Sequence, residues 1–215
     1  MIVVVDYGAG NLRSVAKALA ALGHPVQVTD APTAVAAARA LVLPGVGAAA
    51  DTMRNLRARG LEGAVRDYIA SGRPFLGVCM GLQALLTGSE EGGWQPCLDI
   101  VPGRVRRLPA GQKVPHMGWN RVHQVRPHPL FAGIPDGAYF YFVHSFYVEP
   151  VDPAVVIGRT EYGVEFPSAI AQGNVLGTQF HPEKSGALGL RLYANFVRLA
   201  LGELAPEPVA LPRTF

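Results

Sequence analysis

The stretch RPFLGVCMGLQALL, at residues 73–86, decides how the rest of this chain is interpreted. It begins with a short apolar run typical of a buried strand, and its leucines then return at helical spacing. Cys79 lies at the junction, with Gly77 before it and Gly81 after it. On such a turn the side chain points out over the end of the sheet, where the helix N-terminus favours a thiolate. We interpret the turn as a nucleophile elbow; the alternative is a small buried core cysteine.

A second stretch, NVLGTQFHPEKS at residues 174–185, carries a histidine and a carboxylate two positions apart. Its apolar first half is expected to form a strand that ends at His181, and the proline that follows keeps the backbone extended. Glu183 then faces the same way as His181 and can orient its imidazole, although an exposed loop with an ordinary ion pair is the alternative. Together with Cys79, this pattern predicts a Cys–His–Glu triad in which the imidazole takes the thiol proton.

Length and composition predict one domain over residues 1–203, followed by a Pro-rich tail at 204–215. The net charge of +3 comes without a Lys/Arg run, so nucleic acid is not an expected partner. No apolar run is long enough to span a membrane, and the N-terminus lacks the basic region of a signal peptide. Because two cysteines make no disulfide framework and a catalytic thiol needs a reducing compartment, we expect a cytoplasmic protein.

The N-terminal half alternates apolar strands with helices. Strands are expected at residues 2–5, 25–29 and 40–43, and helices over 12–22, from about 48, and over 60–71. This alternation predicts an α/β fold with a doubly wound, mostly parallel sheet flanked by helices. Active sites in such sheets lie beyond the carboxyl ends of the strands, where both Cys79 and His181 fall.

The segment from residue 100 to 177 has short β-rich runs separated by Gly and Pro. Antiparallel strands are expected at residues 103–108, 139–143, 154–160 and 168–171. We interpret them as an added antiparallel β-rich segment on one side of the sheet and not as a separate domain. Residues 88–93 are expected to form a polar loop, and a last amphipathic helix is expected over 186–201.

Two glycine-containing loops have alternative interpretations. The turn DYGAGN at residues 6–11 allows a dinucleotide-binding interpretation, but it lacks the third glycine of that fingerprint and has only Asp30 as its acid. The PGVG loop at residues 44–47 can supply N–H groups for an oxyanion hole if it lies near Cys79, or it can be a plain tight turn.

Two further segments, VPHMGWN and YFYFVHSF, are too polar and aromatic for simple edge strands. Their His116, Trp119, Tyr141 and His144 are open to interpretation as packing residues. With GVCMGLQ and FHPEKS, the chain resembles the class I, triad-type glutamine amidotransferases over nearly its whole length. Within that family, DYGAGNLRSV, LPGVGA, VPHMGWN and YFVHSF are most similar to the glutaminase subunits of imidazole glycerol phosphate synthase, which serve histidine biosynthesis.

The resemblance implies that Cys79 attacks the side-chain amide of glutamine, while His181, oriented by Glu183, moves the proton to the leaving ammonia. It implies no cofactor and no metal. The residues that it places around the oxyanion and the substrate are Val46, Gly47, Met80, Gln83, Ser145 and Phe146.

The resemblance also implies a heterodimer with a cyclase subunit, a (β/α)₈ barrel. The barrel receives the ammonia and makes imidazole glycerol phosphate and aminoimidazole carboxamide ribonucleotide, so we expect no phosphate site in this chain. The partner surface is expected to contain Asn11, Trp119, Tyr141 and Lys184, because exposed aromatics are frequent in interfaces. Lys184 should leave the triad on the opposite side of an extended chain, and the alternative for Trp119 is packing in the core.

Three other functions stay open at this point. The chain can serve a different amidotransferase, such as those of pyridoxal phosphate or anthranilate synthesis, although VPHMGWN and PGVG argue against this. It can be a non-catalytic interaction protein that keeps the fold, which the intact Cys79, His181 and Glu183 oppose. It can also be a stand-alone cysteine hydrolase that turns over glutamine without a partner.

Overall fold

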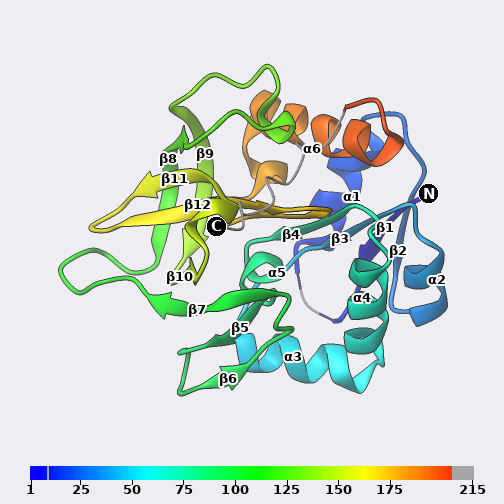
Figure 1. Ribbon diagram of the computed structural model, residues 1–215, viewed down its shortest axis with the longest axis horizontal. Coiled ribbons are helices and arrows are strands. Elements are labelled where there is room, and N and C mark those ends of the chain that lie inside the picture. The colour runs from blue at the N-terminus through cyan, green and yellow to red at the C-terminus, as the bar shows by residue number, and fades with distance from the viewer. Residues whose placement is uncertain (9, 205–215) are drawn as a thin grey trace, which may run out of the picture.

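A nine-stranded sheet runs through the centre of the computed structural model, which describes residues 1–8 and 10–204 (Figure 1). Its five parallel strands are, in spatial order, β2 (Val26–Thr29), β1 (Ile2–Val5), β3 (Ala40–Leu43), β4 (Phe75–Val78) and β13 (Val175–Thr178). The antiparallel continuation consists of β12 (Glu165–Gln172), β11 (Val156–Glu161), β8 (His116–Gln124) and β9 (Ala138–His144). This order confirms the predicted α/β class, with antiparallel strands added on one side.

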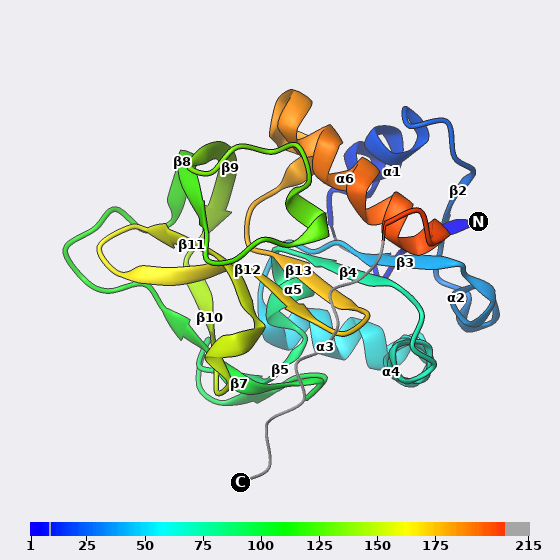
Figure 2. The ribbon, with the colours of Figure 1, turned by 45° about the horizontal axis from the view of Figure 1, so that its top comes forward.

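The helices cover both faces of the parallel strands. They are α1 (Leu12–Ala20), α2 (Pro32–Ala37), α3 (Ala49–Ala58), α4 (Leu61–Ala70), α5 (Met80–Gln83) and α6 (Gly186–Leu201). Strand β1 is apolar throughout because both of its faces are buried. Val3 and Val5 pack with residues of α3 and α4, while Ile2 and Val4 pack with residues of α1 and α6 on the other face (Figure 2).

A second sheet lies below the main one in the view of Figure 1. Its strands, in spatial order, are β10 (Phe146–Pro150), β7 (Val101–Arg107), β5 (Leu86–Ser89) and β6 (Gln95–Pro96). The strand expected at residues 103–108 therefore belongs to this sheet, whereas those expected at 139–143, 154–160 and 168–171 extend the main sheet. Strand β5 pairs with β7 in parallel, so this part is not wholly antiparallel.

The helix that follows Cys79 is shorter than the sequence predicted. Helix α5 is a single turn, and the chain enters β5 at Leu86, which pairs with Val101. The predicted helical spacing through Leu86 was wrong. The loop predicted at 88–93 is shorter than expected: residues 88 and 89 belong to β5, while residues 90–93 lie outside any helix or strand. A short apolar run fits a buried helix and a buried strand equally well, so only its partners decide between them.

The last helix, α6, has the predicted bounds. Strand β8 was not assigned from the sequence, although it pairs along its length with β9. The described residues also form three 3₁₀ turns, which are η1 (Pro129–Phe131), η2 (Pro153–Val155) and η3 (Pro182–Lys184). The expected Pro-rich tail lies, from residue 205, outside the described residues. Within the part that is described, no helix is both long enough and apolar enough to cross a membrane.

Candidate active site

Cys79 lies on the turn between β4 and α5, with backbone angles φ 54° and ψ −106°. Positive φ is costly for a residue with a Cβ atom, and such strain is concentrated at functional sites. The Cys79 N–H donates to the Thr178 carbonyl at 2.7 Å and fixes the turn. A side chain on Gly81 would collide with the Leu43 carbonyl, and one on Gly77 would collide with the backbone of Gly81. The two glycines therefore let this elbow form.

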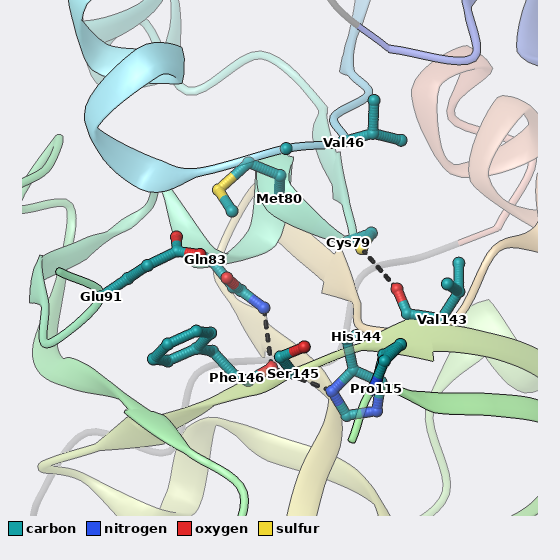
Figure 3. Close-up of a pocket in the computed structure, with 11 residues that line it drawn as sticks. Val46, Cys79, Met80, Gln83, Glu91, Pro115, Val143, His144, Ser145 and Phe146 are labelled. Carbon is teal, nitrogen blue, oxygen red and sulfur yellow. Dashed lines mark hydrogen bonds between the residues drawn. The ribbon is translucent and has the colours of Figure 1, made fainter. Parts of the chain in front are cut away.

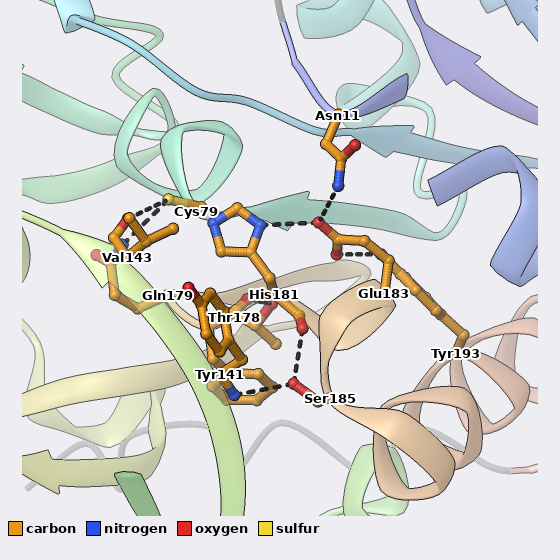
Figure 4. A network of polar contacts seen from close by, with 11 residues as sticks. Asn11, Cys79, Tyr141, Val143, Thr178, Gln179, His181, Glu183, Ser185 and Tyr193 are labelled. Atoms are coloured by element: carbon orange, nitrogen blue, oxygen red, sulfur yellow. Dashed lines mark hydrogen bonds and ion pairs between the residues drawn. The ribbon is translucent and has the colours of Figure 1, made fainter. Parts of the chain in front are cut away.

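His181 and Glu183 are buried together beside the elbow. The Nδ1 atom of His181 donates to Oε1 of Glu183 at 2.8 Å. The other ring nitrogen, Nε2, is buried without a hydrogen-bond partner and lies on the side of Cys79 (Figure 4). Glu183 also accepts hydrogen bonds from Asn11 Nδ2 at 3.4 Å and from the Tyr193 hydroxyl at 3.2 Å. The imidazole therefore lies between a sulfur and an anchored carboxylate.

The charges of this group support one another. Burial lowers the pKa of His181, but the negative charge of an ionised Cys79 and the bond to Glu183 outweigh it and raise that pKa to about 10. Burial raises the pKa of Glu183, but the hydrogen bond and charge of His181 outweigh it, so the pKa of this carboxyl is lowered. A protonated imidazole is thus the stable partner of a charged sulfur, and His181 can hold the proton that Cys79 loses.

The backbone around Glu183 differs from the prediction. His181 is extended, with φ −101° and ψ 97°, but Pro182–Lys184 forms the 3₁₀ turn η3. Proline is well suited to the first position of a helical turn, because its fixed φ already matches. Lys184 therefore does not leave on the opposite side of an extended chain: its Nζ atom lies 5.7 Å from the centre of the Tyr141 ring.

A cavity of about 250 Å³ opens beside Cys79 (Figure 3). Its lining contains all six residues that were expected around the oxyanion and the substrate, namely Val46, Gly47, Met80, Gln83, Ser145 and Phe146. Glu91, Pro115 and Val143 were not predicted from the sequence, and His144 was left open to interpretation as a packing residue; all four line the same cavity. Glu91 Oε2 accepts from the Ala49 N–H at 2.8 Å, which anchors it at the start of α3. No local pattern marked Glu91, because residues 88–93 were interpreted as a loop.

The PGVG loop lies directly against the elbow. A Cβ atom on Gly45 would lie 2.6 Å from Cβ of Met80, so this glycine allows the close approach. Gly47 has φ 90°, and the Val46 side chain is 40% exposed at the cavity mouth. Val46 and Gly47 line the same cavity as Cys79, so the loop lies near the elbow, as the oxyanion interpretation requires.

The four residues expected at a partner surface fall into two groups. Asn11 donates to Glu183 at 3.4 Å and therefore lies against the predicted triad. Trp119 is 55% exposed, which contradicts packing in the core. It lies on β8 opposite Tyr141 of β9, with ring centres 6.2 Å apart, and Lys184 lies beyond Tyr141. Trp119, Tyr141 and Lys184, here called the aromatic patch, are therefore neighbours on the surface.

The described chain has the architecture of solved glutamine amidotransferases. One crystal structure of a glutamine amidotransferase superposes with a TM-score of 0.74 at 24% sequence identity, covering 93% of this chain and 98% of that one. At that identity the likeness shows the fold alone. The sequence also matches the family "Glutamine amidotransferase class-I" over residues 3–199. The chain belongs to the class-I glutamine amidotransferase family.

Two relatives define its place within the family. The "Imidazole glycerol phosphate synthase subunit HisH" of Moorella thermoacetica is 56% identical over 198 residues, which cover 92% of this chain and 94% of the relative. The HisH subunit of Herpetosiphon aurantiacus is 55% identical over 201 residues, covering 94% and 95%. This chain therefore groups with the HisH subunits, the glutaminase subunits of imidazole glycerol phosphate synthase in histidine biosynthesis.

Proposed function

We propose that this chain hydrolyses glutamine to glutamate and ammonia with a Cys79–His181–Glu183 triad. It then passes the ammonia to a cyclase subunit with a (β/α)₈ barrel. The observation that carries the proposal is the buried His181, which is bonded to Glu183 on one side and has its free Nε2 on the side of Cys79. This is the arrangement of nucleophile, base and orienting group that acyl transfer needs.

The chemistry follows from the positions of these atoms. The Cys79 sulfur attacks the amide carbon of glutamine, and His181 gives its proton to the amide nitrogen, which leaves as ammonia. Water, deprotonated by His181, then attacks the γ-glutamyl thioester and releases glutamate with the free sulfur. Met80 is the first residue of α5, and N–H groups at a helix start have no partner within the helix. Its N–H and the backbone at Val46 and Gly47 would hold the oxyanion.

The cavity suits glutamine as the substrate. Gln83 of α5 borders it together with Ser145 and Phe146, and these three residues would contact the substrate. The Glu91 carboxylate, which also borders it, is available to an ammonium group. The closely similar HisH relatives are named as subunits of imidazole glycerol phosphate synthase, which supports a barrel cyclase as the partner in a heterodimer. A nucleophilic thiol requires a reducing compartment, which supports a cytoplasmic location.

A coupled assay tests this function. The chain is mixed with glutamine alone, and then with a barrel cyclase subunit of imidazole glycerol phosphate synthase and its ribonucleotide substrate. We expect glutamate release to match the formation of imidazole glycerol phosphate in the complex. Equal glutamate release with and without the cyclase, and no imidazole product, would support a stand-alone cysteine hydrolase. Failure of a thiol-reactive glutamine analogue to label Cys79 would support a non-catalytic interaction protein.

The aromatic patch is the surface that we propose for docking the cyclase. Trp119→Ala and Lys184→Ala are expected to weaken the complex or to release glutamate without product, because hot-spot aromatics contribute strongly to binding. A loss of about tenfold or more in affinity is expected for Trp119→Ala, whose side chain is 55% exposed. Binding is measured by titration, and the ratio of glutamate to product is measured in the complex.

A matched control exists for each of these variants. Trp94 is also 55% exposed, but it packs over Gly88 in the second sheet, so Trp94→Ala should leave binding unchanged. Lys17→Ala on α1 serves as the control for the lost charge. Normal affinity and normal coupling in both patch variants would place the interface elsewhere on the molecule.

A further inference from the structure

Gln179 touches the proposed nucleophile, although it belongs to no motif that the mechanism uses. It follows β13 directly, two residues before His181, and its side chain is fully buried. The side-chain Nε2 lies 3.6 Å from the Cys79 sulfur, within hydrogen-bond distance for that atom (Figure 4). Its Oε1 accepts a hydrogen bond from Nε2 of Gln83 at 3.1 Å. The Gln179 amide therefore joins the sulfur to the substrate cavity.

A backbone carbonyl fixes which way this amide points. The Phe146 carbonyl accepts from Gln83 Nε2 at 2.8 Å, and a carbonyl oxygen can only accept. Gln83 must therefore present its NH₂ group, which leaves Oε1 as the only side-chain atom of Gln179 that can accept from it. The NH₂ group of Gln179 must then face the Cys79 sulfur. Turning Gln83 over would bring its oxygen against the Phe146 carbonyl, and turning Gln179 over would bring two NH₂ groups together.

The same carbonyl receives a second donor that fixes it from the other side. His144 Nδ1 donates to the Phe146 carbonyl at 2.9 Å, and His144 Nε2 accepts from Nδ1 of His116 at 2.9 Å. His116 Nε2 in turn accepts from Nδ2 of Asn120 at 3.2 Å. Burial lowers the pKa of His116 to about 4 and that of His144 to about 3, so both rings are neutral near pH 7. The hydrogen-bond directions are therefore constant over the working range.

We propose that Gln179 is a further catalytic residue, whose amide N–H donates to the Cys79 sulfur and stabilises the thiolate relative to the thiol. The thiol form has a competing partner, because its S–H donates to the Val143 carbonyl across 3.9 Å. An N–H donor favours the charged form and a carbonyl acceptor favours the neutral one. The assignment rests on the proposed function for its role in glutamine hydrolysis.

The titratable groups around the sulfur stay the same when Gln179 is replaced. The titratable groups that face it or line its cavity are His181, Tyr7, His144 and Glu91. Burial raises the pKa of Tyr7 to about 12, so Tyr7 is neutral, and both nitrogens of His144 are already bonded. All four groups are kept in a Gln179 variant, so a change in Cys79 reactivity reports on the amide itself.

The pH dependence of Cys79 alkylation by iodoacetamide tests the proposal without reference to glutamine. Gln179→Met keeps the size of the side chain but removes the N–H donor, and we expect it to raise the apparent pKa of Cys79 by about one unit. Gln179→Glu replaces the donor with an anion and should raise that pKa further. The exposed Gln172, at the end of β12, provides the control Gln172→Met, which should leave the alkylation profile unchanged.

Two measurements make the result decisive. Mass spectrometry shows which of the two cysteines carries the label. Little label is expected on Cys97, because it is buried and burial raises its pKa to about 11. Thermal melts establish whether each variant is folded. If the Gln179 variants do not fold, Gln83→Met replaces them in the alkylation experiment, because it releases the Gln179 amide from its anchor. An unchanged Cys79 profile in the folded variants overturns the proposal. If the profile moves but neither the variants nor the parent hydrolyse glutamine, the proposed function fails while the contact to the sulfur stands.

Discussion

Cys79→Ala is expected to abolish glutamine-dependent synthesis by the complex and to leave ammonia-dependent synthesis largely intact. The sulfur is the proposed nucleophile at the cavity, whereas the cyclase would carry out the later chemistry with any source of ammonia. Loss of a nucleophile from a catalytic triad costs on the order of 10³-fold or more in turnover. Glutamate release and imidazole product are measured in the same complex, first with glutamine and then with an ammonium salt.

Cys97 provides the matched control for this variant. It is also a buried cysteine, but its Sγ atom contacts the Gln95 carbonyl at 3.6 Å and does not border the cavity beside Cys79. Cys97→Ala should therefore alter stability at most, and not the ratio of glutamine-dependent to ammonia-dependent synthesis. Glutamate release by Cys79→Ala at the rate of the parent would show that the triad assignment is wrong.

His181→Ala is expected to cost nearly as much as Cys79→Ala, because members of one catalytic unit are not additive. Without the imidazole, neither the thiol proton nor the leaving nitrogen has a partner for proton transfer. The double variant should be little worse than either single one, which is measured as kcat/KM for glutamine in the complex. Parent-like activity of His181→Ala would assign proton transfer to another group. His144 is a poor candidate, because both its nitrogens are already bonded.

Glu183→Gln is expected to reduce activity only in part. The amide oxygen can still accept from His181 Nδ1, while its NH₂ group can donate to the Tyr193 hydroxyl, which now donates to Glu183. The ring therefore stays oriented. The charge of Cys79, the larger of the two that raise the pKa of His181, is kept, but the charge of Glu183 is lost. We expect a smaller loss than for His181→Ala, together with a fall in the pKa of His181. A loss equal to that of His181→Ala would mean that orientation also fails.

The sequence by itself determined the parts of the fold that depend on local sterics and periodicity. Four consecutive apolar residues at 2–5 require burial on both faces, and β1 is covered by helices on both faces. Gly77 and Gly81 at their spacing allow the strained turn at Cys79, because any side chain there would meet backbone atoms. The bounds of α6 followed in the same way from its apolar stripe.

The tertiary structure decided what depends on contacts between distant parts of the chain. Asn11 and Glu183 are 172 residues apart, and Gln179 and Cys79 are 100 residues apart, yet each pair is in contact. Leu86 begins a strand and does not extend a helix, because Val101 is its neighbour. The spacing of residues along the chain predicts local structure. A long-range hydrogen bond or the register of two strands, in contrast, exists only once two segments of the chain meet. The elbow was therefore predictable from the sequence, whereas the donor aimed at its sulfur was not.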